Sequence, residues 1–358
     1  MTSTTRRDFL TASAALAASA SLAHAQSNSP IATPSGPDPA VHDPVPDLPT
    51  PESTRKGDML YRKLGNTGET VSLVGLGGAH IGGPAEDTAI KIVRRAIDSG
   101  ITFIDNCWDY YDGDCELRMG KALKDGYRKK VFLMTKVDGR TKDAAAKQLD
   151  ESLKRLQTDV IDLWQFHENI RMDDPDRFFA KGGAVEAFQD AKKAGKIRFI
   201  GFTGHKDPAV HLRMLAVAKQ HNFHFDTCQM PLNVMDAHFR SFAHLVVPEL
   251  LNVGTAPLAM KTLGGGILLR SNTLSATQCI QYAMNLPVAT VICGIDSDKI
   301  LDQALAAAQS FQPMTKDQVA ALLAKTKDAA AQGAFELFKT SDRFDGTARN
   351  PKWMGLAS

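Results

Sequence analysis

The sequence predicts an α/β fold of the (β/α)8 type, a TIM barrel preceded by an N-terminal hairpin. Eight short apolar segments, each too short for a helix, recur at intervals of about 25 to 40 residues. Most are separated by stretches with helical periodicity, such as DTAIKIVRRAIDSG. The chain has 358 residues, 43% of them hydrophobic, which is enough to bury a sizeable core. Eight alternating strands and helices favour a closed parallel barrel.

The expected strands cover residues 72–78, 101–107, 131–137, 161–167, 199–205, 225–231, 253–261 and 289–295. Ahead of them, the turn Gly65–Gly68 lies between two strand-like flanks and predicts a hairpin that closes the bottom of the barrel. An open doubly wound sheet is the alternative fold. It would normally carry a G-x-G-x-x-G turn after its first strand, and the glycines at 75–78 lack that spacing.

The N-terminus resembles a twin-arginine export signal over residues 1–25. Arg6 and Arg7 precede a short Ala-rich apolar stretch, and Ala23-His24-Ala25 has the small residues of a cleavage site. The apolar stretch is too short to argue for a stable membrane span. We therefore expect a periplasmic protein whose partners include the twin-arginine export machinery, which would carry it folded and with any cofactor already bound.

The rest of the chain divides by composition. Residues 26–57 hold eight of the seventeen prolines and few large apolar side chains, which predicts an extended linker. The barrel is expected over residues 58–340, and residues 341–358 form a C-terminal tail or a lid over the barrel mouth, with Trp353 as a candidate lid residue.

Charge and cysteine content narrow the function. The net charge is +2 and no basic stripe interleaved with aromatics occurs, so no nucleic-acid partner is expected. The five cysteines are an odd number without metal-like spacing. We expect at least one unpaired thiol within a monomer and no metal, although Cys107 and Cys115 are close enough in sequence to form a disulfide.

Four residues suggest carbonyl chemistry at one end of the barrel. Asp105, Lys136 and His167 each end a predicted strand, and Tyr110 follows Asp105 by five residues, so all four should face one mouth, where barrel active sites form. Tyrosine, with a reference pKa near 10, would need a cation such as Lys136 to become an effective proton donor. Asp105 would hold the lysine, and His167 could bind the carbonyl oxygen. Taken singly, each residue also has a structural explanation.

These motifs resemble the aldo-keto reductase family. The resemblance rests on FIDNCWDYYDGDCELRMGKAL, on the Lys of VFLMTKV and the His of IDLWQFH, and continues through KAGKIRFIGFTGH, FDTCQMPLN and AMKTLGGG. It spans about residues 59–310. It implies a (β/α)8 barrel, a catalytic tetrad of Asp105, Tyr110, Lys136 and His167, and NADPH or NADH as cofactor.

The resemblance also implies cofactor contacts. Thr203 matches the Ser of a Ser-Asn pair that contacts the nicotinamide carboxamide, but Gly204 replaces the Asn and has no side chain to contribute. Met260 stands where many members have an aromatic residue. Cofactor NADP(H) is slightly favoured over NAD(H) because Lys299 takes one basic position. The full set of expected cofactor residues is Thr203, Gln229, Met260, Lys261, Gly264, Gly265, Ser297, Lys299 and Gln303.

The substrate pocket is expected to hold a small aldehyde, ketone or sugar, since aromatic residues and histidines lie near the predicted mouth. The candidates are His80, Trp108, Tyr111, Trp164 and His205.

Three functional hypotheses follow. The first is an NAD(P)H-dependent oxidoreductase that interconverts a carbonyl and an alcohol, with Tyr110 as general acid. The second is a non-catalytic, nucleotide-binding or partner module in the periplasm, where free NADPH is not expected. The third is an enzyme that recycles one tightly held cofactor between two substrates.

Overall fold

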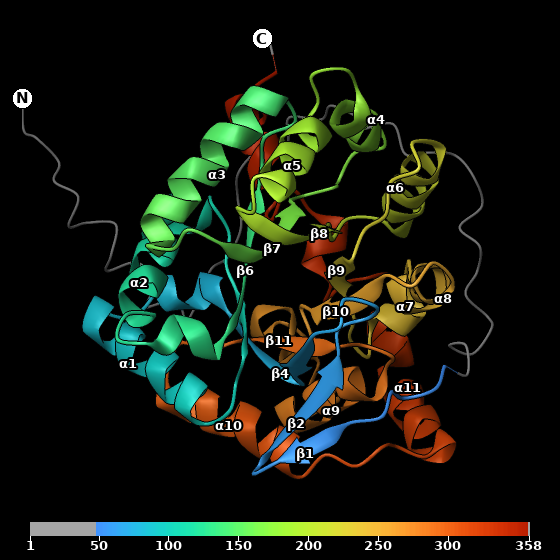
Figure 1. The fold of residues 1–358 in the computed structure, drawn as a ribbon. Coiled ribbons are helices and arrows are strands. Elements are labelled where there is room, and N and C mark those ends of the chain that lie inside the picture. Colours follow the sequence, from blue (N-terminus) through green and yellow to red (C-terminus); the bar gives the residue numbers. More distant parts are fainter. Residues whose placement is uncertain (1–47, 357–358) are drawn as a thin grey trace, which may run out of the picture. The chain divides into compact units, whose positions relative to one another are not determined.

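Eight parallel strands close into a barrel, which confirms the predicted fold (Figure 1). The computed structural model describes residues 48–356. Around the barrel the order is β10-β11-β4-β5-β6-β7-β8-β9. Each strand overlaps one predicted segment: β4 (Val74–Gly77), β5 (Phe103–Asp105), β6 (Phe132–Val137), β7 (Ile161–Phe166), β8 (Ile197–Thr203), β9 (Thr227–Pro231), β10 (Ala256–Met260) and β11 (Thr290–Gly294).

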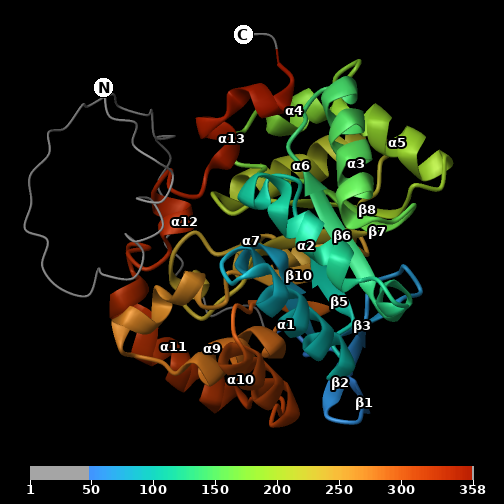
Figure 2. The same ribbon diagram turned by 90° about the vertical axis from the view of Figure 1, so that its left-hand side faces the viewer.

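Helices form the outer layer around these strands (Figures 1 and 2). Local sequence sets their starts: Thr141 caps α3 through its side chain, and Ser275 with Gln278 forms a capping box on α9. The helices are α1 (Glu86–Asp98), α2 (Asp114–Ala122), α3 (Lys142–Leu156), α4 (Asp174–Phe179), α5 (Ala184–Lys193), α6 (Pro208–Gln220), α7 (Phe242–Leu245), α8 (Val247–Asn252), α9 (Ala276–Asn285), α10 (Asp298–Gln309), α11 (Lys316–Ala330), α12 (Leu337–Thr340) and α13 (Gly346–Arg349).

The two-residue alternation of the strands separates two cores. Inside the barrel one buried cluster includes Phe103, Met134 and Leu163, whereas Ile104 and Leu133 belong to the cluster between the strands and the helices. Side chains two residues beyond an inward-facing one face inward again. The polar residues at the C-terminal strand ends are therefore directed into the barrel mouth.

The predicted hairpin is confirmed, and it closes the other end of the barrel. Strands β2 (Met59–Lys63) and β3 (Thr70–Ser72) pair antiparallel, and Leu64 and Val71 pack against the inner cluster. The structure adds strand β1 (Thr54–Lys56), which pairs with β2. The predicted linker boundary at residue 57 is therefore wrong at its C-terminal end, because backbone pairing with β2 makes Thr54–Lys56 part of the folded sheet.

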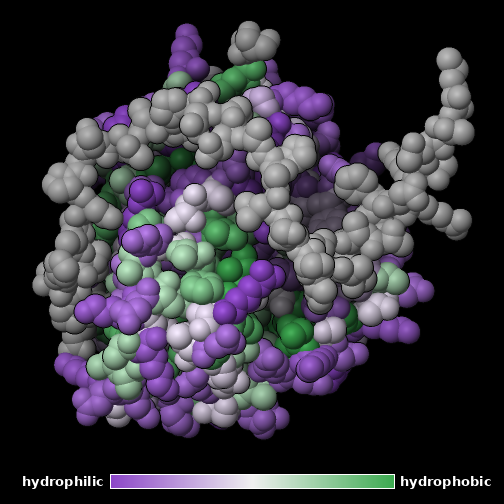
Figure 3. All heavy atoms as spheres, turned by 180° about the vertical axis from the view of Figure 1, so that it is seen from behind, coloured by the Kyte–Doolittle hydropathy of each residue, from purple (hydrophilic) through white to green (hydrophobic). Residues whose placement is uncertain are grey.

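The predicted signal over residues 1–25 lies outside the described residues, as does residue range 26–47 of the predicted linker. Among residues 48–356, no helix has the length and apolar character needed to cross a membrane. The space-filling view shows hydrophobic and hydrophilic residues interspersed on the face that is not drawn in grey (Figure 3).

Candidate active site

Lys136 is the central residue of the predicted tetrad. It faces inward near the end of β6, two residues beyond the core residue Met134, and is 1% exposed. Its Nζ donates to Asp105 Oδ1 at 2.6 Å, to the Asn106 carbonyl at 2.7 Å and to the Tyr110 hydroxyl at 3.2 Å. A buried ammonium is tolerated because these oxygens replace its water. The structure thus joins Asp105, Tyr110 and Lys136 in one hydrogen-bonded group.

The proton affinity of Tyr110 differs from the sequence-based expectation. Burial raises the pKa of its phenol well above the usual value, and the nearby Asp105 carboxylate raises it further. Lys136 therefore does not bring the pKa of the phenol below its usual value. Its position 3.2 Å from the hydroxyl instead suits it to stabilise a negative charge on the Tyr110 oxygen.

A left-handed backbone turn follows Tyr110, whose side chain borders the cavity. Tyr111 and Asp112 have φ values of 53° and 54°, and Gly113 follows with φ 93°. The left-handed region costs a non-glycine residue about 1–2 kcal/mol. At Gly113 a Cβ atom would lie 2.4 Å from the Arg155 guanidinium carbon, so a side chain there would require that arginine to move. The segment YYDG thus turns the chain directly after the Tyr110 phenol.

Gln229 contacts the tetrad directly. Its Nε2 donates to Asp105 Oδ2 at 2.6 Å, so the two oxygens of that carboxylate are held by Gln229 and Lys136. The Gln229 amide oxygen is buried and has no hydrogen-bond partner among residues 48–356. An unpaired buried acceptor is unfavourable. This oxygen is therefore ready to accept a hydrogen bond from a ligand amide.

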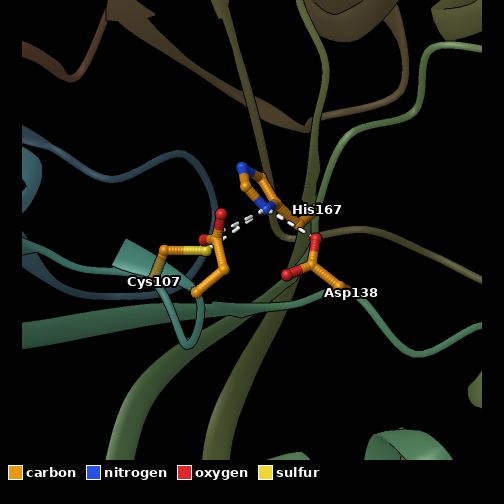
Figure 4. Close-up of side chains that lie close together, drawn as sticks. Cys107, Asp138 and His167 are labelled. Carbon is orange, nitrogen blue, oxygen red and sulfur yellow. Dashed lines mark hydrogen bonds and ion pairs between the residues drawn. The ribbon is translucent and has the colours of Figure 1, made fainter. Parts of the chain in front are cut away.

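His167 is held through one ring nitrogen. Its Nδ1 lies 2.9 Å from Asp138 Oδ1, 3.2 Å from Cys107 Sγ and 3.8 Å from Asp109 Oδ1. Figure 4 shows that the other ring nitrogen points away from Cys107 and Asp138. Burial lowers the pKa of His167, but the Asp138 carboxylate, with Asp109 and Glu168, more than offsets this and leaves it above its usual value. The site thus favours a positively charged imidazole.

These side chains border a cavity of about 640 Å³ at the C-terminal ends of the strands. That volume suits a small-molecule ligand. Twelve of the proposed site residues line this cavity: Asp105, Tyr110, Lys136, His167, Thr203, Gln229, Met260, Lys261, Gly265, Gln303, His80 and His205.

Two of the proposed substrate residues do not border this cavity. Trp164 is fully buried, and its ring stacks on Phe188 of α5 at 3.7 Å between centroids. It faces the helices because it is offset by one residue from the inward-facing Leu163. Trp108 does not border the cavity either, because its indole nitrogen donates to Glu151 at 2.7 Å and its ring contacts Trp353 edge-on.

Four other candidates lie outside the main cavity. Tyr111 and Ser297 border an adjoining hollow of about 560 Å³ that shares His80 with it. Lys299 is exposed in the first turn of α10 and borders neither hollow. Gly264 is buried and does not border the cavity, because the Leu268 side chain packs directly against it.

Sequence reasoning missed the C-terminal segment as a source of defined contacts. Glu168 accepts hydrogen bonds from the backbone N–H groups of Gly346 and Thr347, both at 2.7 Å. Asp345 accepts from His205 at 3.1 Å and pairs with Lys206 at 2.7 Å. This segment places Arg343, Phe344, Gly346 and Arg349 on the cavity boundary. The segment has no periodicity that would have revealed these contacts.

Lys261 meets the same segment. Its Nζ lies 4.6 Å from the centroid of the Phe344 ring, and burial lowers the pKa of Lys261 to about 8. Lys261 adopts φ 58°, and the glycines that follow it continue the turn at the cavity edge. The arrangement leaves the Lys261 amino group on the cavity boundary, where an anionic ligand could bind.

Asp109, Asp138 and Glu168 were also missed as site residues. Asp138 is two residues beyond Lys136, so the strand alternation gave a signal that it faces the mouth. Asp109 and Glu168 directly adjoin Tyr110 and His167 in the sequence. Their contacts depend on loop conformation, which the strand pattern does not define.

Among curated proteins, the chain is similar to several that are named as reductases or dehydrogenases. The chain is 33% identical over 226 residues to aldo-keto reductase YhdN of Bacillus subtilis, covering 59% of this chain and 64% of the relative. It is 40% identical over 157 residues to L-galactose dehydrogenase of Arabidopsis thaliana, covering 40% and 48%. The matched region thus spans less than two thirds of each of these two relatives.

A third relative is also named as a reductase, and the similar solved structures are aldo-keto reductases. The chain is 29% identical over 245 residues to 6-dehydroglucose reductase of Novosphingobium aromaticivorans, covering 63% of this chain and 74% of the relative. The fold matches the holo form of aldo-keto reductase AKR11C1 from Bacillus halodurans, with a TM-score of 0.63, 24% identity, and coverage of 75% and 96%. An aldo/keto reductase from Klebsiella pneumoniae in complex with NADP and acetate matches with a TM-score of 0.59, 22% identity, and coverage of 75% and 94%.

The family model agrees with the residue pattern that the sequence analysis recognised. The model described as the aldo/keto reductase family matches residues 73–279, which contain all four tetrad residues. Together with the closed eight-stranded barrel, this match shows that the chain belongs to the aldo/keto reductase family.

Proposed function

We propose that this protein is an NAD(P)H-dependent oxidoreductase that interconverts a carbonyl and an alcohol, with Tyr110 as the general acid. The observation that carries the proposal is the contact of Lys136 Nζ with both Asp105 and Tyr110 beside a cavity of about 640 Å³. The additional phenol contact matches a site in which a proton leaves oxygen and a cation stabilises the charge left behind.

The residues at the cavity fit a nicotinamide cofactor. The unpaired amide oxygen of Gln229 could accept from the carboxamide of the ring, and Thr203 lies at the same boundary. Gly204 has no side chain to contribute, and a larger residue would not fit at this position, because its Cβ atom would lie 2.3 Å from the Asn169 carbonyl oxygen. A bound reduced nicotinamide would supply the hydride for the carbonyl carbon.

The chain's own residues would manage the charge on the substrate oxygen. As negative charge develops there, Tyr110 donates its phenolic proton and Lys136 stabilises the phenolate. Asp105 holds the lysine, so the cation does not drift toward solvent. His167 directs its second ring nitrogen away from its carboxylate partner and can donate to the same substrate oxygen. In the oxidation direction each proton moves the opposite way.

The proposed substrate class is a small polar aldehyde, ketone or sugar. Charged and imidazole side chains line the cavity alongside apolar ones, and two of the relatives are named for sugar substrates. Such walls suit a hydroxylated molecule better than an apolar one, because polar groups left unpaired by a ligand are costly. Turnover of a panel of aldoses and matched alkyl aldehydes tests this; equal kcat/KM for both groups would contradict the polar preference.

For the cofactor, NADP(H) stays slightly preferred on the basis of Lys299, which is exposed in the first turn of α10, two residues after Ser297. Titration calorimetry with NADPH and NADH, on the wild type and on Lys299→Ala, tests this assignment. The variant should lose affinity for NADPH only. An unchanged NADPH affinity would remove Lys299 from the proposed site.

Export by the twin-arginine route to the periplasm also remains a proposal, supported by Arg6 and Arg7 in the sequence. Because free NADPH is not expected there, the alternatives are a tightly held cofactor recycled between two substrates and a non-catalytic nucleotide-binding module. The anchored C-terminal segment at the cavity edge favours retention of a ligand. Mass spectrometry of native periplasmic protein would report the mature N-terminus and any bound nucleotide; a nucleotide that no substrate oxidises or reduces would favour the module.

A further inference from the structure

We propose that this protein has a binding site for a divalent metal ion such as Zn²⁺ or Co²⁺, formed by Cys107, Asp109, Asp138 and His167. Each residue offers one ligand atom, and the four atoms all lie within 4.8 Å of one another. No sequence motif indicates such a site, because these residues come from three separate strand ends and have no metal-like spacing along the chain. Only the closure of the barrel brings them together.

The distances are close to those of a tetrahedral metal centre. Measured from His167 Nδ1, Asp138 Oδ1 lies at 2.9 Å, Cys107 Sγ at 3.2 Å and Asp109 Oδ1 at 3.8 Å. Zinc bonds of about 2.0 Å to nitrogen and oxygen and about 2.3 Å to sulfur place neighbouring ligand atoms about 3.3–3.6 Å apart. The three distances from His167 Nδ1 are thus within about half an ångström of these values, and the remaining pairs lie within 4.8 Å. Figure 4 shows Cys107 and Asp138 directed at the same ring nitrogen.

Two carboxylate oxygens in the cluster lack a hydrogen-bond partner among residues 48–356. They are Asp109 Oδ1 and Asp138 Oδ2, and the Asp138 side chain is fully buried. Buried carboxylate oxygens without partners are strongly unfavourable, and two carboxylates on one side of an imidazole concentrate negative charge. A bound cation would coordinate Asp109 Oδ1 and offset the negative charge of the buried Asp138 carboxylate.

The ligand types select the ion. A cysteine sulfur and an imidazole nitrogen suit Zn²⁺ or Co²⁺, whereas Mg²⁺ and Ca²⁺ prefer oxygen ligands alone. Binding would replace the thiol proton of Cys107 and release it to solvent. The ion has a route to the site, because Asp109 and His167 border the cavity while Cys107 and Asp138 lie behind them.

The cluster does not have the geometry of a nucleophilic cysteine site. In a Cys-His-Asp triad the thiol and the carboxylate contact opposite ring nitrogens, so that the imidazole can relay a proton. Here both contact Nδ1. A thiol and a carboxylate gathered on the same side of the imidazole are instead what a metal requires.

Cobalt binding tests the site without reference to turnover, so its outcome is independent of the proposed oxidoreductase activity. The reduced full-length protein is titrated with Co²⁺ and followed by absorbance. We expect one Co²⁺ per chain, visible bands of a tetrahedral ion, and a near-ultraviolet sulfur-to-cobalt charge-transfer band, all removed by added Zn²⁺. Absence of the charge-transfer band in the wild type would overturn the proposal.

Variants assign the ligands. Cys107→Ser should abolish the charge-transfer band, and Asp138→Asn should weaken Co²⁺ binding by about tenfold or more. Cys115→Ser is the matched control, because Cys115 is another buried free thiol nearby in the sequence that is not part of the cluster. It should leave the spectrum unchanged. Circular dichroism of each variant checks folding, and a band that survives in folded Cys107→Ser would refute the site.

Discussion

The buried pair of Lys136 and Asp105 gives a prediction that can be worked through quantitatively. Their charged atoms lie 2.6 Å apart, and the two side chains are 1% and 4% exposed. Replacing one partner leaves the other charge buried without compensation, which typically costs about 3–5 kcal/mol of folding free energy. We expect a loss of this size for Lys136→Met. The Asp105→Asn variant should lose less, because Asn can still accept from Lys136.

The double variant separates the pair from its surroundings. With both charges gone, no uncompensated ion remains, so the double variant should be more stable than the sum of the single losses by about 1.5–3 kcal/mol. Urea unfolding of the four proteins, followed by fluorescence and circular dichroism, measures this coupling. Additivity within about 0.5 kcal/mol would show that the two side chains do not interact as the structure shows, and would refute the reasoning.

Three further predictions concern residues outside the tetrad. Burial raises the pKa of Glu336 to about 7, with the Lys339 charge opposing the shift, so the folded state binds this proton more tightly than the unfolded chain. The free energy of unfolding should therefore fall by up to about 3 kcal/mol between pH 5 and pH 8. A Glu336→Gln variant whose stability falls equally with pH would contradict this. Trp164→Ala should lower stability by about 3–5 kcal/mol but leave KM values unchanged, since the ring stacks on Phe188; a changed cofactor KM would reinstate it as a site residue. Glu168→Gln should speed amide hydrogen exchange at Gly346 and Thr347, which donate to this carboxylate, and unaltered exchange measured by mass spectrometry would show that Glu168 does not anchor the segment.

The barrel could be predicted because strand periodicity is a local property of the sequence. Each buried strand has a short apolar run, and inward and outward positions alternate along it. That alternation correctly placed Asp105 and Lys136 at the mouth. Applied strictly, it would also have excluded Trp164, which is one residue out of phase with Leu163, and would have pointed to Asp138.

The remaining site residues depend on contacts between distant segments. Glu168 accepts hydrogen bonds from the backbone of Gly346 and Thr347, which lie 178 and 179 positions away in the sequence. No local pattern in either segment predicts this contact. Cys107 likewise reads as a small buried residue until barrel closure brings His167 beside it. Strand β1 was missed for the same reason, because only pairing with β2 distinguishes Thr54–Lys56 from the proline-rich stretch before it.

Single-turnover kinetics on Tyr110→Phe would test the central claim most directly. The variant keeps the ring next to Lys136 and removes only the proton donor. With NADPH bound in advance and a reactive aldehyde added, we expect the rate of NADPH oxidation to fall by about 10²–10⁴-fold while cofactor affinity stays unchanged. A rate within threefold of the wild type would contradict the account, because the proton would then come from a group other than Tyr110.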